Sequence, residues 1–136
     1  MSTRSTIAIE TKNGAVQQVY CHYDGYPSYV GRILLENYST PEKLQSLIEQ
    51  GSISSLDKSI GTKHSFDDRP EGETTFYARD RGEELDLDEY WNFEVYRCSA
   101  YMEEYNYIMR NDGIWYFSKG SGKFTRLTET RTKELF

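Results

Sequence analysis

The stretch VYCHYDGYPSYVGRILLENY, residues 19–38, decides how the chain begins to fold. The residues around Cys21 would place their side chains alternately on the two faces of a β-strand. Asp24-Gly25 then ends that strand. From Ser28 to Tyr38 the apolar residues recur at i, i+4 spacing, which predicts a helix. We therefore expect a strand, a tight corner and a helix, with Gly31 allowing the helix to approach the sheet closely.

The sequence on either side extends this pattern. Ser5 to Thr11 predicts a strand, Asn13-Gly14 a hairpin turn, and Val16 to Tyr23 the returning strand. After the first helix, Thr40-Pro41 supplies a hydroxyl cap followed by proline in the first turn of a second helix. Gly51 is a suitable stop for that second helix.

The second half of the chain predicts a loop followed by sheet. Residues 59–73 contain the glycines and proline typical of a loop, which we expect to be mobile. Segments rich in aromatic or β-branched residues follow as predicted strands: Thr74–Arg79, Tyr90–Arg97, Glu104–Arg110, Ile114–Phe117 and Lys123–Leu127. The tail from Thr128 is polar. We thus predict one α+β domain, residues 1–136: an N-terminal β-hairpin, two short helices and then an antiparallel β-meander, with the helices packed on one sheet.

Charge and composition exclude several classes of protein. The 136 residues carry a net charge of −6, which argues against a general nucleic-acid binder. Acidic residues concentrate at positions 83–89, and we interpret that run as a solvated rim. No apolar run is long enough for a membrane span, and the polar residues 1–6 do not resemble a signal peptide. We expect no membrane association and a cytoplasmic location, where Cys21 and Cys98 stay reduced.

One candidate for chemistry is the segment Cys21-His22-Tyr23-Asp24. On a strand Cys21 and His22 point to opposite faces, which argues against a cysteine–histidine nucleophile pair. His22 and Asp24 share a face and could serve as general acid and base, but we favour a packed His22 beside an Asp24 that starts a turn. A metal needs three or four ligands, and the only other histidine, His64, lies in the loop. We therefore expect no metal and no cofactor.

A second candidate is an anion site in the segment 77–84. Arg79 and Arg81 would share a face of the predicted strand, and two parallel guanidinium groups can hold a phosphate or a carboxylate. They could equally pair with Asp80 or with the glutamates that follow, and we favour such structural ion pairs.

The corner itself is the third candidate. A turn that leads into a helix points backbone N–H groups outward, and Tyr26 and Tyr29 could stack on a planar ring beside them. The spacing matches no nucleotide-binding motif, so the phosphate signal is weak. A packed corner, with Tyr29 turned inward, explains the same residues.

Blocks of the sequence resemble a family of small, largely uncharacterised accessory proteins of tailed bacteriophages. The blocks are STRSTIAIE (residues 2–10), YCHYDGYPSYVG (20–31), GSISSL (51–56) and RDRGE (79–83). The resemblance implies a protein made in the cytoplasm of an infected bacterium. By analogy with other small acidic phage proteins, it implies a role in counter-defence or host takeover.

Tyrosine is the unusual residue of the composition, with 12 in the chain. We expect a non-catalytic protein that binds and inhibits a host bacterial protein through a tyrosine-rich sheet face. The residues expected on that face are Tyr20, Tyr105, Tyr107 and Tyr116. One alternative is a sponge that sequesters a small anionic nucleotide signal on Arg79, Arg81, Tyr26 and Tyr29. A second alternative is a small hydrolase-like enzyme that uses His22 and Asp24. Exposed aromatic strands are also compatible with a homodimer.

Overall fold

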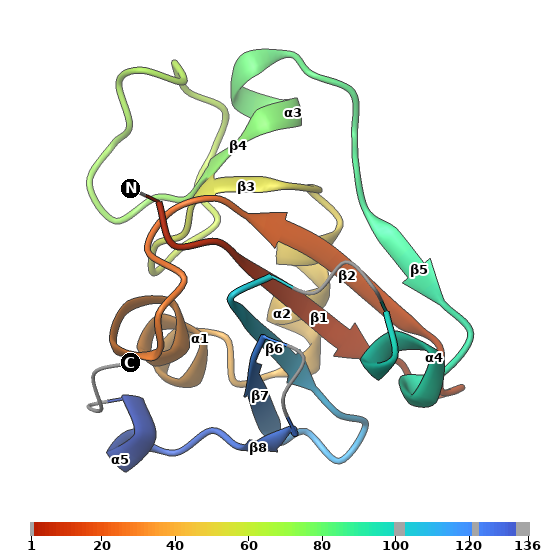
Figure 1. Ribbon diagram of the computed structural model, residues 1–136. Helices are drawn as coiled ribbons and strands as arrows, with labels where there is room; N and C mark the ends of the chain where they lie inside the picture. Colours follow the sequence, from red (N-terminus) through yellow and green to blue (C-terminus); the bar gives the residue numbers. More distant parts are fainter. Residues whose placement is uncertain (1, 100–102, 121–122, 133–136) are drawn as a thin grey trace.

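The chain folds as an α+β protein, as the sequence predicts. The computed structural model describes residues 2–99, 103–120 and 123–132, and Figure 1 shows their arrangement. The strands are β1 (Ser5–Glu10), β2 (Val16–Cys21), β3 (Ile53–Ser55), β4 (Thr75–Phe76), β5 (Asp88–Tyr90), β6 (Tyr105–Met109), β7 (Trp115–Lys119) and β8 (Thr125–Arg126). The helices are η1 (Pro27–Gly31, a π-helical turn), α1 (Arg32–Asn37), α2 (Pro41–Ile48), α3 (Tyr77–Arg81), α4 (Phe93–Arg97) and α5 (Glu129–Thr132).

All the described strands belong to one mixed sheet. Their order is β4-β3-β2-β1-β6-β7-β8, and β5 pairs with the opening residues of β2. The predicted hairpin is β1–β2, and β6, β7 and β8 form an antiparallel meander. The sequence did not predict that β1 would pair with β6 in parallel, with Ile9 opposite Met109. This parallel pairing joins the two halves of the chain through the centre of the sheet.

The sheet has a core on each face. The larger core lies under η1, α1 and α2, and it includes Val19 and Cys21 of β2. The smaller core lies under α4, where Tyr96 packs on Ala8, Val16 and Ile108. Because side chains alternate along a strand, odd-numbered residues of β1 and β2 serve the first core and even-numbered residues the second. We call the α4 side the second face.

The corner at residues 24–31 is tightly packed, as its sequence predicts. The Tyr107 hydroxyl reaches under it and donates a hydrogen bond of 2.7 Å to the carbonyl oxygen of Gly25. A Cβ on Gly31 would lie 3.2 Å from the Tyr107 ring, so the glycine permits this close approach. The helix that follows starts as a π-helical turn and then becomes α1.

Two predicted strands are helical instead. Residues 74–79 form only the short β4 and then turn into α3, because the Asp80 carboxylate reaches back to accept from the N–H of Phe76 at 2.9 Å. Residues 90–97 contain α4, because the Asn92 side chain accepts from the N–H of Val95 at 2.9 Å and caps a helix. The prediction from the sequence gave more weight to the aromatic residues of these two segments than to the residues that cap their helices.

The remaining comparisons with the sequence-based prediction concern β3, the loop 59–73, the polar tail and one turn. The short strand β3 was not predicted. The loop 59–73 is irregular as expected, although an isolated bridge joins Ser59 to Glu73, and its mobility stays a prediction. The polar tail forms α5 up to Thr132. The turn predicted at 119–122 includes residues 121–122, which lie outside the described residues.

The tyrosine hydroxyls of the two cores allow a matched test. Tyr96 is fully buried, and its hydroxyl has no hydrogen-bond partner among the described residues, whereas the Tyr107 hydroxyl is bonded. A buried hydroxyl without a partner costs about 1–3 kcal/mol. We expect Tyr96→Phe to keep or raise the free energy of unfolding and Tyr107→Phe to lower it by about 1 kcal/mol, measured by urea denaturation. Equal losses in both variants would contradict this assignment.

Candidate functional site

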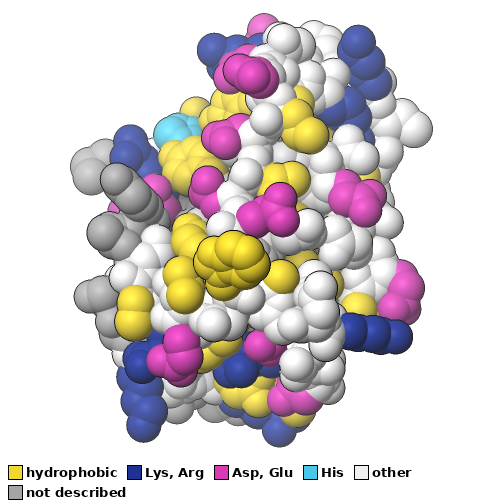
Figure 2. Space-filling model, turned by 90° about the vertical axis from the view of Figure 1, so that its right-hand side faces the viewer, with side chains coloured by type: hydrophobic (Ala, Val, Ile, Leu, Met, Phe, Trp, Pro, Cys, Tyr) yellow, Lys and Arg dark blue, Asp and Glu magenta, His cyan; other side chains and the backbone are white. Residues whose placement is uncertain are grey.

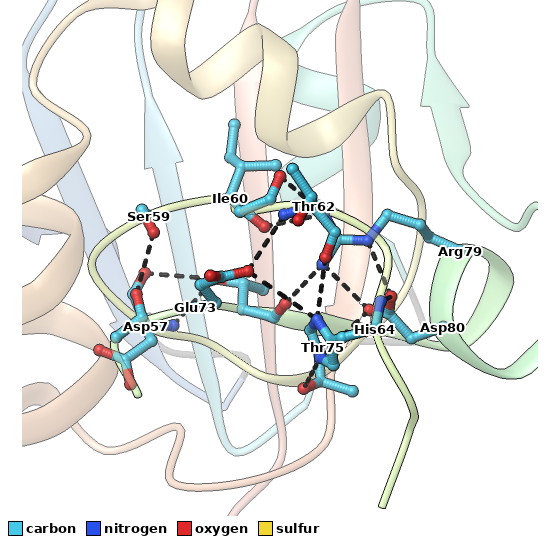
Figure 3. Close-up of polar contacts among 12 residues, drawn as sticks. Asp57, Ser59, Ile60, Thr62, His64, Glu73, Thr75, Arg79 and Asp80 are labelled. Carbon is cyan, nitrogen blue, oxygen red and sulfur yellow. Dashed lines mark hydrogen bonds and ion pairs between the residues drawn. The ribbon is translucent and has the colours of Figure 1, made fainter. Parts of the chain in front are cut away.

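A buried carboxylate, Asp80, ties the loop 59–73 to α3. Its oxygens accept hydrogen bonds from the N–H groups of His64 and Phe76 and from the Arg79 guanidinium at 2.9 Å. Burial raises the pKa of Asp80, but these hydrogen bonds and the Arg79 charge outweigh burial, so the pKa lies below its usual value. Figure 3 shows His64, Arg79 and Asp80 pointing toward one another beneath the loop. We call these three residues the Asp80 latch.

Arg79 uses its whole guanidinium group inside this latch. Besides Asp80, it donates to the carbonyl oxygens of Ile60 at 2.8 Å, Gly61 at 3.2 Å and Thr74 at 2.9 Å. Every guanidinium nitrogen therefore already has a partner, and none is left for a phosphate. The predicted anion clamp is wrong at Arg79, and the structural ion pair that we favoured is confirmed.

Arg81 lies apart from this network because α3 replaces the predicted strand, so the two guanidinium groups do not run parallel. It is exposed, forms an ion pair of 2.9 Å with Glu83, and lies over the Phe66 ring. This pair is again structural, and exposed pairs of this kind contribute little to stability.

His64 is surrounded by polar groups, as a catalytic histidine would be, but its side chain is enclosed. Its side chain is only 8% exposed, its Nδ1 contacts the carbonyl oxygen of Thr62 at 2.9 Å, and its Nε2 contacts the Thr75 hydroxyl at 3.1 Å. Both ring nitrogens therefore hold the loop in place (Figure 3). Among the described residues, no cluster of three His, Cys, Asp or Glu side chains is arranged to hold a metal ion.

His22 and Asp24 do not form the predicted acid–base pair. The strand ends at Cys21, and Asp24 adopts a left-handed conformation with φ of 58°, so the alternation that would align the two residues stops. His22 instead contacts the Tyr20 hydroxyl at 2.6 Å, and Asp24 accepts from the Tyr26 hydroxyl at 3.3 Å. Burial raises the pKa of the Cys21 thiol to about 12, which leaves that thiol unreactive.

The two tyrosines of the corner stay away from α3. Tyr29 donates its hydroxyl to the carbonyl oxygen of Leu56, while Tyr26 is exposed. Both belong to the η1 corner, and no described contact joins them to Arg79 or Arg81. The structure therefore does not assemble the predicted nucleotide site.

The four tyrosines predicted to bind a partner divide between the two faces of the sheet. Tyr105 and Tyr107 are buried in the larger core, so the prediction that they contact a partner is wrong. Tyr20 and Tyr116 have the opposite parity and are half-buried on the second face. Only these two remain available to a partner.

The segment that leads from α3 through β5 into α4 carries an exposed surface that the sequence did not single out. Trp91, at the junction of β5 and α4, is 89% exposed, and Leu85 and Val95 are also exposed. The same segment also exposes six acidic side chains: Glu83, Glu84, Asp86, Asp88, Glu89 and Glu94. Figure 2 shows this side of the molecule, with hydrophobic side chains near its centre and acidic ones around them. We call the exposed residues of segment 83–95 the Trp91 surface.

A cavity of about 590 Å³ opens at the upstream end of the Trp91 surface. It is lined by Tyr20 and Ser52 of the sheet, Tyr77 and Ala78 of α3, and residues 83–86 of the acidic segment. Aromatic rings and carboxylates together suit a cationic group. The half-buried Tyr20 therefore shares one continuous region with the acidic segment.

Comparison of the chain with protein-family models, with curated proteins and with solved structures finds no significant match.

None of the helices in the described ranges has the length and apolar character that crossing a membrane requires.

Proposed function

We propose that the chain is a phage-encoded, non-catalytic protein that binds and inhibits a host bacterial protein in the host cytoplasm, in counter-defence or host takeover. The observation that carries the proposal is the 89% exposure of Trp91. Tryptophan is the side chain that a folded protein gains most by covering, and it is enriched among the residues that dominate binding energy. The phage context rests on the resemblance of the four sequence blocks.

The fold holds Trp91 ready for a partner. On one side β5 is paired with β2, with Tyr90 opposite Val16, and on the other side Asn92 caps α4. The indole is thus displayed between two ordered elements instead of on a free loop. Such preorganisation favours binding because less conformational entropy is lost when the complex forms.

The charge around Trp91 specifies the kind of partner. The segment 83–95 carries six carboxylates and no basic residue, and the nearest basic residues in the sequence are Arg81 before it and Arg97 after it. A partner surface rich in lysine and arginine would be complementary and would be steered toward this face. A protein surface that otherwise binds nucleic acid has this chemistry.

The alternatives have less support from the geometry. Catalysis by His22 and Asp24 lacks their mutual contact, and the nucleotide sponge lacks the free guanidinium of Arg79. Binding through the Trp91 surface requires neither a contact between His22 and Asp24 nor a free guanidinium group on Arg79. Binding through this surface is therefore the function that we propose.

The proposal predicts that Trp91→Ala weakens capture of the host partner by about tenfold or more. Tagged protein would be recovered from infected and uninfected bacteria, and its bound species identified by native mass spectrometry. The free energy of unfolding should not change, because the indole makes little contact in the free protein. Tyr26→Ala, which removes an exposed aromatic side chain elsewhere, is the matched control and should capture the partner normally.

Two results would count against this function. Equal capture by the Trp91→Ala and unmodified proteins would remove the surface from the interaction. A bound mass of a few hundred daltons, with no protein partner, would favour the nucleotide alternative.

A further inference from the structure

Two tyrosines form one wall of the cavity of about 590 Å³ at the upstream end of the Trp91 surface. Tyr20 is an even-numbered residue of β2, so its side chain lies on the second face of the sheet. Burial raises the pKa of Tyr20, and the nearby Tyr77 phenol raises it further, so the two hydroxyls lie close together. Both residues are half-buried, and both line the cavity.

The acidic segment forms the wall opposite these tyrosines. Just before β5, Leu87 packs on the larger core, whereas Asp88 accepts a hydrogen bond of 3.4 Å from Gln18 on the second face. Alternation of side chains along this approach to β5 puts Asp86 on the same side as Asp88. The segment is held beside the sheet because the hydroxyl of Ser52 donates to the Asp86 carbonyl oxygen at 3.4 Å.

Two carboxylates of this wall form no ion pair within the described ranges. Glu83 is paired with Arg81 at 2.9 Å, and that guanidinium group also lies 5.9 Å from the centre of the Tyr77 ring. Glu84 and Asp86 are exposed and have no such partner among the described residues. None of the residues that line the cavity is basic, so its negative charge is not balanced from within.

A ring with a carboxylate beside it is the arrangement that holds other arginines of this chain. At three places in the described residues a guanidinium group lies over a ring and pairs with a carboxylate: Arg79 with Phe76 and Asp80, Arg81 with Phe66 and Glu83, and Arg110 with Phe93 and Glu10. The guanidinium carbons lie 4.6, 5.0 and 3.6 Å from the respective ring centres. The cavity offers the same two kinds of group to a guanidinium from outside the chain.

We propose that this cavity receives an arginine side chain of the host protein, with the guanidinium group over the Tyr20 ring and its N–H groups donating to Glu84 and Asp86. Arginine fits better than lysine, because a planar guanidinium can stack on a ring and still donate to carboxylates at its edge. The identity of the arginine's source rests on the proposed function, since the Trp91 surface brings a basic partner to the cavity. The preference for a guanidinium group does not rest on it.

A matched pair of probes tests this preference on the unmodified protein: N-acetyl-arginine N-methylamide and the corresponding citrulline compound. Citrulline has nearly the same shape, but a neutral urea replaces the guanidinium. In a titration followed by amide NMR, the arginine compound should shift the signals of residues 20, 52, 77–78 and 83–86. The citrulline compound should bind about tenfold more weakly, and the lysine compound about threefold more weakly.

A pair of double variants connects the cavity to the partner. Glu84→Gln with Asp86→Asn removes the two unpaired charges at nearly constant volume, and it should weaken binding of the arginine compound by about tenfold. Capture of the host protein from infected bacteria should weaken several-fold as well. Glu36→Gln with Glu71→Gln makes the same change in net charge on exposed residues outside the cavity and the Trp91 surface. This control should leave both measurements unchanged.

Several outcomes would overturn the inference. The arginine compound could leave the cavity signals unshifted at its highest soluble concentration, or bind no better than the citrulline or the lysine compound. Equal effects of the two double variants on capture would remove the cavity from the interface. Failure of the proposed function would differ from these results: the arginine compound would bind in the cavity, but the unmodified protein would capture no host protein. That result would overturn the host protein as the source of the arginine and leave the guanidinium preference standing.

Discussion

Replacing Asp80 with alanine is expected to lower the free energy of unfolding by about 3–5 kcal/mol, since it removes one partner of a buried ion pair. Arg79 would keep its charge in a largely enclosed place with only carbonyl oxygens around it. The N–H groups of Phe76 and His64 would lose their acceptor as well. The start of α3 and the anchored loop 59–73 should therefore loosen together.

Urea denaturation measures this loss, with Glu83→Ala as the matched control. Glu83 also pairs with an arginine of α3, but both partners are about half exposed, so we expect a loss below about 1 kcal/mol. If Asp80→Ala does not fold, Asp80→Asn removes the charge and keeps an acceptor oxygen for only one of the two N–H groups, because His64 and Phe76 donate to different oxygens of Asp80. Similar losses for the Asp80 and Glu83 variants would mean that the latch does not stabilise the loop.

The same carboxylate predicts how stability depends on pH. The pKa of Asp80 is lower in the folded chain than the value of about 3.9 for an unfolded aspartate. The unfolded state therefore takes up the proton first as the pH falls. The contribution of Asp80 is complete above the unfolded pKa and is lost as the pH falls through the folded pKa. We expect Asp80→Asn to lose less stability than the unmodified protein between about pH 5 and the folded pKa.

Local signals explain which parts of the fold could be predicted from the sequence. Asn13-Gly14 sets a hairpin turn, and Thr40 does cap α2, where its hydroxyl accepts from the N–H of Lys43. Each signal acts within a few residues, so it is visible without tertiary contacts. The pairing of β1 with β6 joins residues from opposite ends of the chain, and no local pattern encodes it.

The functional residues were harder to predict because exposure depends on that pairing. Tyr105 and Tyr107 look like Tyr20 and Tyr116 in the sequence, but only the first pair is buried in the larger core under η1, α1 and α2. The acidic run before Trp91 is exposed, as predicted for a solvated rim, but the sequence did not show that its end forms β5 and positions the indole. Asn92 was the one local sign of α4, and it was visible in the sequence.

Replacing Gly25 with alanine is expected to cost about 3 kcal/mol or more, although the backbone of Gly25 does not have a positive φ. The added Cβ would lie 2.7 Å from Ser5 Cβ and 2.9 Å from the carbonyl oxygen of Thr3, well inside a normal contact of roughly 3.5–4.0 Å. The Gly25 N–H bonds to that same Thr3 oxygen at 2.8 Å, so the two segments cannot separate without losing this bond.

Gly14→Ala separates this steric effect from backbone strain. Gly14 has φ of 91° but no atom within 4 Å of an added Cβ, so only strain of about 1–2 kcal/mol is expected. Urea denaturation should therefore rank Gly25→Ala as the less stable variant. The reverse order would show that the corner can open away from β1. In that case the hydrogen bond from the buried Tyr107 hydroxyl to the Gly25 carbonyl oxygen would not be the contact that fixes the corner on the sheet.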